Sequence, residues 1–288
     1  MNKILCGLFL LAQVAVADPK VERLVEGLEF TEGPVWVPEK EGVVFSDVRA
    51  SKLYLWTEKK GLEVFREASG RGNGNVLDAE GRLITCEGGN TRVTRLEKDG
   101  TFTVLASEFE GQPLNNPNDV TVGKDGSVYF TDPNFGKKDR VDFQFVYRVK
   151  PDGEVEKAIP QSFNKPNGIA MSPDGKILYV NVGMDHWTLA YPVNDDGSVE
   201  DAPKRVADGI DKVLDGLAVH PATGDLYLAV FTNNRNQPDE QGIQIFSAKG
   251  KYQGMIPIPG NTTNVCFGED ENTLYVTSGG SLFRVTLQ

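Results

Sequence analysis

The sequence predicts an all-β protein: a six-bladed β-propeller in which an N-terminal strand closes the last blade. Three observations support this fold. No segment of convincing length has helix periodicity, and short runs rich in Val, Tyr, Phe, Leu and Thr alternate with Gly, Pro, Asn and Asp. A hairpin pattern recurs along the chain at a nearly constant spacing. The last copy ends one strand short, while a spare strand precedes the first copy.

The first 17 residues are set apart from this fold. Lys3 lies in a short basic start, an apolar run follows from Ile4, and the small residues Ala15 and Ala17 come just before Asp18. This pattern is typical of a secretory signal peptide cleaved after residue 17, and its apolar run is too short for a transmembrane helix. We therefore expect one domain over residues 18–288 in an exported protein, periplasmic or secreted.

The repeat defines the blades. Its hairpins include "EGPVWVPEKEGVVFSD" and "NDVTVGKDGSVYFTD", and the six first residues are Glu32, Asn73, Asn118, Asn167, Asp215 and Thr263, spaced 41, 45, 49, 48 and 48 residues apart. A third strand such as "KLYLWTE" follows each hairpin, and in the first five units a fourth, less regular strand such as "LEVFREA" comes next. Six four-stranded units describe a propeller, whereas a pair of β-sandwiches gives no reason for a sixfold period.

The two chain ends are expected to share the sixth blade. The sixth unit stops after its third strand, "SLFRVTLQ", and the stretch "VERLVEGLEF" at residues 21–30 can supply the missing fourth strand. Joining both ends in one sheet leaves no free edge at the seam.

Composition narrows the set of partners. The formal charge of −11 argues against nucleic acids and anionic membranes and favours soluble metabolites and cations. After the signal peptide only Cys86 and Cys266 remain. Two distant cysteines form no disulfide framework, and we expect both to be buried thiols.

The register predicts a metal site. In a propeller the first strand of each blade lines the channel, so the six first residues converge at one end; all carry oxygen, and two are carboxylates. Such a ring suits a hard divalent cation, Ca²⁺ before Mg²⁺ or Mn²⁺, with Zn²⁺ disfavoured. Prolines before Asn118 and Asn167 would pre-aim those amides. The alternative for any one position is that Asn or Asp at a strand start only caps a turn.

The motifs "EGPVW", "PNDVTVGKDGSVYFTDPNFG", "KPNGIAMSPDGKILYV", "DGLAV" and "TTNVCFG" resemble those of the gluconolactonase/senescence-marker-protein family over about residues 26–286. The resemblance implies a six-bladed propeller with one catalytic divalent cation, usually Ca²⁺ or Zn²⁺, on the channel axis. It implies Glu32, Asn167 and Asp215 as metal ligands. Asn118 matches a position that is a metal ligand in some members and a substrate contact in others.

Two positions depart from the family pattern. Gly88 stands where bacterial members often have His, and Val182 stands where Asp is common. Neither change touches the metal ring, but we expect both to alter the rim of the site and hence the choice of substrate.

Together these inferences predict an enzyme that hydrolyses a sugar lactone. Asp215 is the first candidate for activating the attacking water, because the resemblance and its place in the ring both indicate it. Asp119 is the second candidate, with the alternative that it is a turn carboxylate bonded to backbone amides. Asn116, Arg71 and His186 are candidate substrate contacts.

Two other functions stay open. A metal-dependent esterase or phosphotriesterase would use the same ring, and a non-catalytic exported propeller would bind a sugar or a protein around a structural ion. A Ser-His-Asp triad is not expected, because the chain has two histidines and His220 lies in a turn at the opposite end of the channel.

Overall fold

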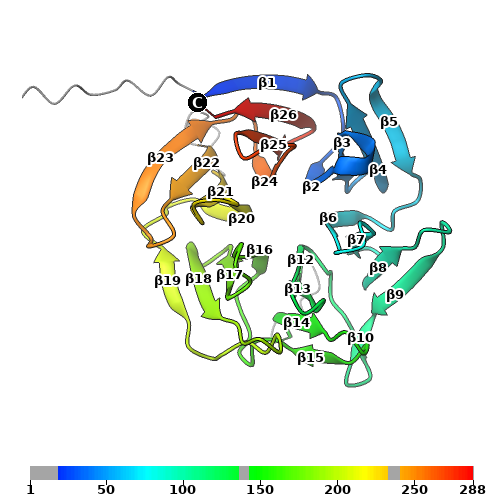
Figure 1. The fold of residues 1–288 in the computed structure, drawn as a ribbon, viewed down its shortest axis with the longest axis vertical. Helices are drawn as coiled ribbons and strands as arrows, with labels where there is room; N and C mark the ends of the chain where they lie inside the picture. Colours follow the sequence, from blue (N-terminus) through cyan, green and yellow to red (C-terminus); the bar gives the residue numbers. More distant parts are fainter. Residues whose placement is uncertain (1–18, 136–142, 233–240, 288) are drawn as a thin grey trace, which may run out of the picture.

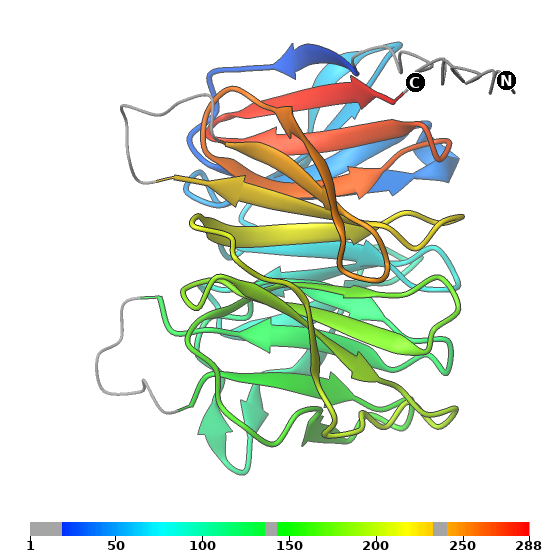
Figure 2. The same ribbon diagram turned by 90° about the vertical axis from the view of Figure 1, so that its left-hand side faces the viewer.

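The computed structural model describes residues 19–135, 143–232 and 241–287. Within these ranges a single 3₁₀ turn, η1 (Pro38–Lys40), is the only helical segment, and six four-stranded antiparallel sheets surround a central channel (Figure 1). Seen from the side, the strands run across the thickness of the ring (Figure 2). The predicted six-bladed all-β propeller is confirmed.

Five blades are made of four consecutive strands each, in order from the channel outward. Blade 1 contains β2 (Thr31–Val37), β3 (Gly42–Asp47), β4 (Lys52–Thr57) and β5 (Gly61–Arg66). Blade 2 contains β6 (Gly72–Leu77), β7 (Leu83–Glu87), β8 (Arg92–Leu96) and β9 (Phe102–Ala106). Blade 3 contains β12 (Val120–Val122), β13 (Val128–Asp132), β14 (Phe145–Val149) and β15 (Val155–Lys157).

Blade 4 contains β16 (Pro166–Met171), β17 (Ile177–Val182), β18 (Trp187–Pro192) and β19 (Lys204–Ala207). Blade 5 contains β20 (Val213–Val219), β21 (Leu226–Phe231), β22 (Gly242–Phe246) and β23 (Tyr252–Pro257). A small hairpin of β10 (Glu108–Phe109) and β11 (Gln112–Pro113), which the repeat does not predict, lies between blades 2 and 3 in the chain.

The sixth blade joins the two ends of the chain, as predicted. Its strands from the channel outward are β24 (Thr262–Phe267), β25 (Thr273–Ser278), β26 (Ser281–Thr286) and the N-terminal β1 (Lys20–Val25). β1 pairs antiparallel with β26, and it is shorter than the predicted stretch 21–30. Across the seam, Trp36 of blade 1 stacks on Tyr275 of blade 6 with ring centroids 5.6 Å apart.

The hydrophobic core is divided among the blade interfaces. Six clusters of buried side chains each join two neighbouring sheets. Their largest fully buried members include Tyr129, Tyr191 and Phe45, and each such side chain contributes about 1.5–3 kcal/mol when removed from water. The valine-, tyrosine- and phenylalanine-rich runs of the repeat are therefore the packing surfaces between blades, which leaves the channel for polar groups.

Some predictions concern residues beyond the core. Cys86 is buried and Cys266 is half-buried, and both are free thiols, so the burial expected of Cys266 is only partly found. The predicted signal peptide, residues 1–17, lies outside the described residues. The described part of the chain contains no helix with the length and apolar character needed to cross a membrane.

Candidate metal and active site

The channel strands leave regular pairing close to their first residues. The register slips between Glu32 and Val35 in β2, and equivalent slips occur near the start of β6, β16, β20 and β24. Bulges of this kind interrupt the strict alternation of side chains and re-aim them, often beside active sites. The sequence therefore places its polar residues where the inner strands can turn them toward the channel.

The four predicted metal ligands are all buried. Glu32, Asn118, Asn167 and Asp215 are between 3 and 7% exposed, although none lies in a hydrophobic cluster. Three of them are close neighbours, because in addition to burial the Glu32 charge raises the pKa of Asp215 and the nearby Asn167 amide partly offsets that rise. Asn167 Nδ2 donates to the backbone oxygen of Leu214 at 3.3 Å, next to Asp215. Residues from blades 1, 4 and 5 thus meet at one end of the channel, as the register predicts.

The carboxylates of this ring repel one another electrostatically. Burial, together with the nearby Asp119 charge, raises the pKa of Glu32 to about 8. Burial and then the charges of Glu32 and Asp119 raise the pKa of Asp215 well above its usual range. Ionised carboxylates so close together in a desolvated place are unfavourable without a cation.

Two amide oxygens in the ring also lack partners. Among the described residues, Asn73 Oδ1 and Asn167 Oδ1 are buried and accept no hydrogen bond, which is costly for a polar atom. The described ranges contain no group of three or more His, Cys, Asp or Glu side chains arranged to hold a metal, so any cation here would depend on amide oxygens as well. Carboxylate and amide oxygens, with two amides awaiting a partner, fit a hard divalent ion.

A glycine follows the ring residue in four blades because adjacent blades approach closely there. A Cβ at Gly33 would lie 2.1 Å from the backbone oxygen of Asn73, and one at Gly216 would lie 2.0 Å from Asn264 Oδ1. Gly74 and Gly168 are equally crowded. Blades 3 and 6 instead carry side chains at this position, Asp119 and Asn264.

Asp119 lies just below the ring. Its Oδ1 accepts the backbone N–H of Val120 at 3.0 Å and its Oδ2 accepts that of Ile169 at 3.2 Å. It lines a channel cavity of about 250 Å³ deeper than the ring, and burial raises its pKa to about 6. These contacts match the turn-carboxylate interpretation and tie blade 3 to blade 4.

The sixth blade departs from the predicted ring. Thr263 Oγ1 donates to the backbone oxygen of Thr31 at 2.8 Å and also bonds Thr277, so it joins blades 6 and 1 and does not face the ring. The polar channel residue of this blade is Asn264, whose Nδ2 donates to Glu32 Oε2 at 3.3 Å. The Asn264 amide is also close enough to Asp119 to offset part of the rise in the pKa of that carboxyl. β24 has the same one-residue register offset as the other bulged channel strands, but it leaves one residue unpaired, Thr263, where they leave two.

Asn264 is a positioning residue that sequence reasoning missed, and its removal has a measurable consequence. For the divalent cation that the sequence predicts in this ring, we expect Asn264→Ala to weaken the affinity for Ca²⁺ by about 10- to 100-fold, the usual cost of losing a partner that orients a metal ligand. Calcium titration monitored by calorimetry measures this directly.

A matched control is available in blade 2. Asn75 is equally buried, but its amide bonds backbone oxygens and the hydroxyls of Ser46 and Thr85. Asn75→Ala is expected to lower stability while leaving Ca²⁺ affinity within about threefold. Equal losses of affinity in both variants would reduce Asn264 to a general packing role.

Two of the three predicted substrate contacts lie together beside the ring. Arg71 and Asn116 line a cavity of about 140 Å³ with Asn73, Asn118 and Phe135. The Asn116 amide donates to the backbone oxygen of Gly88 at 3.1 Å. The substituted rim position Gly88 therefore borders this cavity, consistent with an effect on the substrate.

His186 is placed elsewhere. Its Nδ1 lies against the backbone oxygen of Lys212; since a carbonyl only accepts, Nδ1 carries the proton and donates. This contact joins the loop after β17 to the start of blade 5. The residue does not line the cavity that contains Arg71 and Asn116.

The departure at Val182 also has a structural explanation. Asp47 and Asp132 end the second strands of blades 1 and 3, where their carboxylates accept backbone N–H groups of the loops that lead into the channel strands. Val182 ends the second strand of blade 4 and is fully buried. An aspartate at this position therefore holds the preceding loop in place, and we expect its replacement by Val182 in blade 4 to affect the rim only indirectly.

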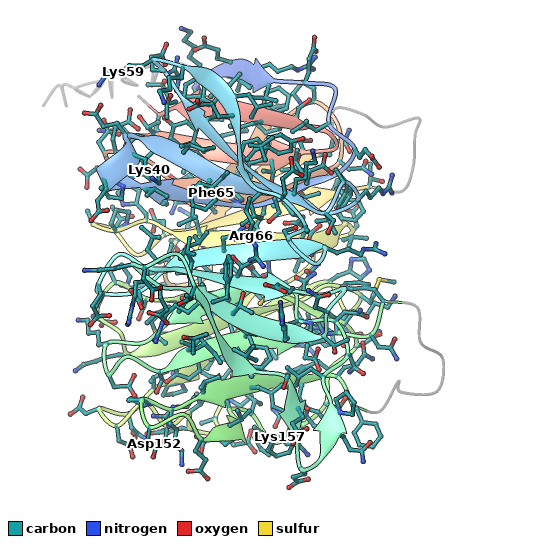
Figure 3. All side chains as sticks on the ribbon, turned by 90° about the vertical axis from the view of Figure 1, so that its right-hand side faces the viewer. Lys40, Lys59, Phe65, Arg66, Asp152 and Lys157 are labelled. Carbon is teal, nitrogen blue, oxygen red and sulfur yellow. The ribbon has the colours of Figure 1, made fainter. Side chains whose placement is uncertain are left out.

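A larger groove lies away from the ring. It has a volume of about 590 Å³ between blades 1 and 2, and its lining includes Lys40, Phe65, Arg82 and Lys98 but no ring residue. Figure 3 shows Lys40 and Phe65 on this outer flank. We assign the chemistry to the smaller cavity because it contains ring residues.

Comparison with known proteins agrees with this geometry. Residues 30–280 match the model of the family described as SMP-30/Gluconolactonase/LRE-like region. A gluconolactonase from Zymomonas mobilis is 27% identical over 92% of this chain and 80% of its own length. Lactonase drp35 from Staphylococcus haemolyticus is 25% identical over 86% of this chain and 75% of its own.

Solved structures give the same picture. A structure described as a gluconolactonase from Xanthomonas campestris superposes with a TM-score of 0.83 at 30% identity, covering 95% of this chain and 91% of that one. Regucalcin from Agrobacterium tumefaciens, described as a calcium-binding protein, gives a TM-score of 0.78 at 19% identity, covering 94% of each chain. The second likeness concerns the fold alone.

Proposed function

The chain belongs to the SMP-30/gluconolactonase/LRE-like family, and we propose that it is a divalent-metal-dependent hydrolase that opens a sugar lactone. One observation carries the proposal: the buried ring of opposed carboxylates and unpartnered amide oxygens directly borders a polar cavity. The gluconolactonases and the lactonase among its relatives support the same class of reaction.

We propose that Glu32, Asn118, Asn167 and Asp215 hold one divalent cation. The all-oxygen donor set favours Ca²⁺ over Mg²⁺, Mn²⁺ and Zn²⁺. When bound, the ion would supply positive charge that polarises the ester carbonyl and offsets the charge developing on its oxygen.

Asp215 is the proposed general base. Its carboxylate lies in the ring, and the Asn167 amide is close enough to offset part of the rise in its pKa. It would take a proton from water as the water oxygen bonds to the lactone carbonyl carbon. The ring C–O bond then breaks, the departing oxygen takes up a proton, and the product is the open hydroxy acid. Asp119 has both carboxylate oxygens engaged by backbone N–H groups, so we assign it to positioning.

The substrate would occupy the cavity beside the ring, contacting Asn116 and Arg71. His186 does not line this cavity, and we assign it to holding the loop after β17 against Lys212. An esterase or phosphotriesterase reaction at the same ring is the second candidate, because the ring itself does not choose the ester. We further propose that the protein is exported, on the basis of residues 1–17.

Chelation tests the proposal. Purified protein is expected to hydrolyse D-glucono-δ-lactone, to lose at least about 90% of that activity on removal of metal, and to recover it when metal is returned. The assay is proton release in weak buffer after EDTA and dialysis, with Ca²⁺, Mn²⁺, Mg²⁺ and Zn²⁺ added back separately. A parallel panel of aryl esters and phosphotriesters separates the second candidate. Absence of lactone hydrolysis with every ion would contradict the proposed function.

A further inference from the structure

The cavity beside the ring has one charged side chain in its lining. It is formed where blades 1, 2 and 3 meet, and its volume is about 140 Å³. The lining residues are Val48, Arg71, Asn73, Gly88, Gly89, Asn116, Pro117, Asn118 and Phe135. In a chain with a formal charge of −11, a cation at the edge of the candidate site is a feature that general composition does not explain.

Arg71 is built into this position by its backbone. Its φ of 55° is in the left-handed region that a non-glycine residue occupies at some cost. Its N–H donates to Ser51 Oγ at 2.8 Å. Its aliphatic stem packs over Gly89, where an added Cβ would lie 2.9 Å from Arg71 Cγ and Cδ. The absence of a side chain at residue 89 therefore makes room for Arg71.

Arg71 also differs from its arginine neighbours in its pairing. Arg66 and Arg92 both donate to the buried Glu87, at 2.6 and 2.8 Å, and so serve a structural ion-pair network. Within residues 19–135, 143–232 and 241–287, no carboxylate forms an ion pair with Arg71. Its guanidinium remains available to a ligand in the cavity.

A second cation approaches the same cavity from blade 4. Lys165 Nζ lies 5.2 Å from the ring centroid of Phe135, which lines the cavity. Lys165 also has a left-handed φ, 59°, and precedes Asn167 by two residues. No ion pair of Lys165 is found within the described residues either. Two separately held cations thus flank the space next to the metal ring.

We propose that Arg71, supported by Lys165, selects sugar lactones that carry an anionic substituent, a carboxylate or a phosphate, over neutral lactones. The inference rests on the proposed function and names its substrate class. The planar guanidinium matches either group with two parallel hydrogen bonds. A neutral lactone would make no ion pair with it.

The test compares three lactones on calcium-loaded protein: neutral D-glucono-δ-lactone, D-glucaro-1,4-lactone with its carboxylate, and 6-phospho-D-glucono-δ-lactone. We expect the wild type to have a higher kcat/KM for at least one anionic lactone than for the neutral one. Arg71→Asn, which tolerates a left-handed φ, should lower kcat/KM roughly tenfold to a hundredfold for the anionic lactones. The neutral lactone should lose clearly less, so that the ratio of anionic to neutral kcat/KM falls by roughly tenfold.

Arg49→Gln is the matched control. Arg49 is exposed in the loop that carries Val48, its guanidinium packs over Phe30, and it does not line the cavity. It should leave all three substrates within about twofold. Equal effects of Arg71→Asn on neutral and anionic lactones, or no effect on either, would overturn the inference while leaving the hydrolase intact.

A ligand-binding measurement tests the inference even if the protein hydrolyses none of the lactones. Calorimetry at fixed free Ca²⁺ compares D-glucarate and 6-phospho-D-gluconate, which carry a second anionic group, with D-gluconate, which has the C1 carboxylate alone. Tighter binding of the ligands with the second anionic group that Arg71→Asn abolishes supports the inference even if no lactone is hydrolysed, whereas equal binding of all three ligands contradicts it. The ratio between the two anionic ligands separates carboxylate from phosphate recognition.

Discussion

Replacing Asp215 with asparagine is expected to reduce lactone hydrolysis by at least about a hundredfold while the propeller stays folded. Asparagine has nearly the same shape and keeps one oxygen toward the proposed cation, but it cannot take a proton from water. Removal of a catalytic group that acts in the transition state typically costs a factor of this size. Burial, and then the charge of the neighbouring Glu32, raise the pKa of the Asp215 carboxyl. Loss of one of two opposed charges should therefore not lower stability.

The measurement is kcat on the best lactone with saturating Ca²⁺, together with thermal unfolding and a calcium titration. Asp211→Asn is the control, because Asp211 is an exposed carboxylate four residues earlier that pairs with Lys212 at 2.8 Å. It should keep wild-type activity. If Asp215→Asn also keeps activity within about threefold, the general-base assignment is wrong. Binding of a sugar or protein that survives the change would then favour a non-catalytic propeller.

The fold could be predicted because the same structural pattern occurs several times in the sequence. Six copies of one hairpin pattern specify the blades, and the strand missing from the last copy matches the spare one at the start. The alignment of these hairpin repeats also predicts that Glu32, Asn118, Asn167 and Asp215 lie at one end of the channel. Their placement depends only on the order of the strands in each blade, which the spacing of the repeats indicates directly.

The polar side chains beneath the ring could not be predicted because they depend on the local form of each bulge. Thr263 occupies the expected place in the repeat, and β24 has the same one-residue register offset as the other bulged channel strands, but it leaves one residue unpaired where they leave two. Asn264 takes the channel position in place of Thr263 and donates to Glu32. Bulges change the direction of individual side chains, and no residue type in "TTNVCF" indicates this change.

The aligned repeats do contain one indication of where these polar side chains beneath the ring lie. The residue after the ring position is glycine in four blades because a Cβ would collide with the neighbouring blade. The exceptions, Asp119 and Asn264, are close neighbours in the channel, where the Asn264 amide offsets part of the rise in the pKa of Asp119. The two blades in which another residue replaces this glycine are therefore the ones in which side chains fill the space beneath the ring, where the other blades have close backbone contact.

Calcium is expected to stabilise the protein more at pH 8 than at pH 5. Without metal, burial and the Asp119 charge raise the pKa of Glu32 from 4.5 to about 8, and burial raises that of Asp119 from 3.8 to about 6. Between the unfolded and folded values the native state holds protons that the unfolded chain has released. The protonated carboxyls therefore add to the stability of the metal-free fold below about pH 4. This contribution is lost as the pH rises through about 6 for Asp119 and about 8 for Glu32. At pH 8 the cation no longer competes with those protons, so binding is tighter.

Thermal unfolding with and without Ca²⁺ at both pH values measures the difference. At about 100 times the Kd, binding contributes about 2.7 kcal/mol, and for a domain of this size each kcal/mol shifts Tm by roughly 2–4 °C. We expect a rise of about 5–10 °C at pH 8 and a clearly smaller one at pH 5 at the same Ca²⁺ concentration. Glu32→Gln removes one titrating ligand and should flatten the dependence, whereas Glu26→Gln, an exposed carboxylate paired with Arg23, should not. Equal shifts at both pH values in the wild type would mean that the ring carboxylates do not bind the ion, because proton competition is unavoidable for ligands with raised pKa values.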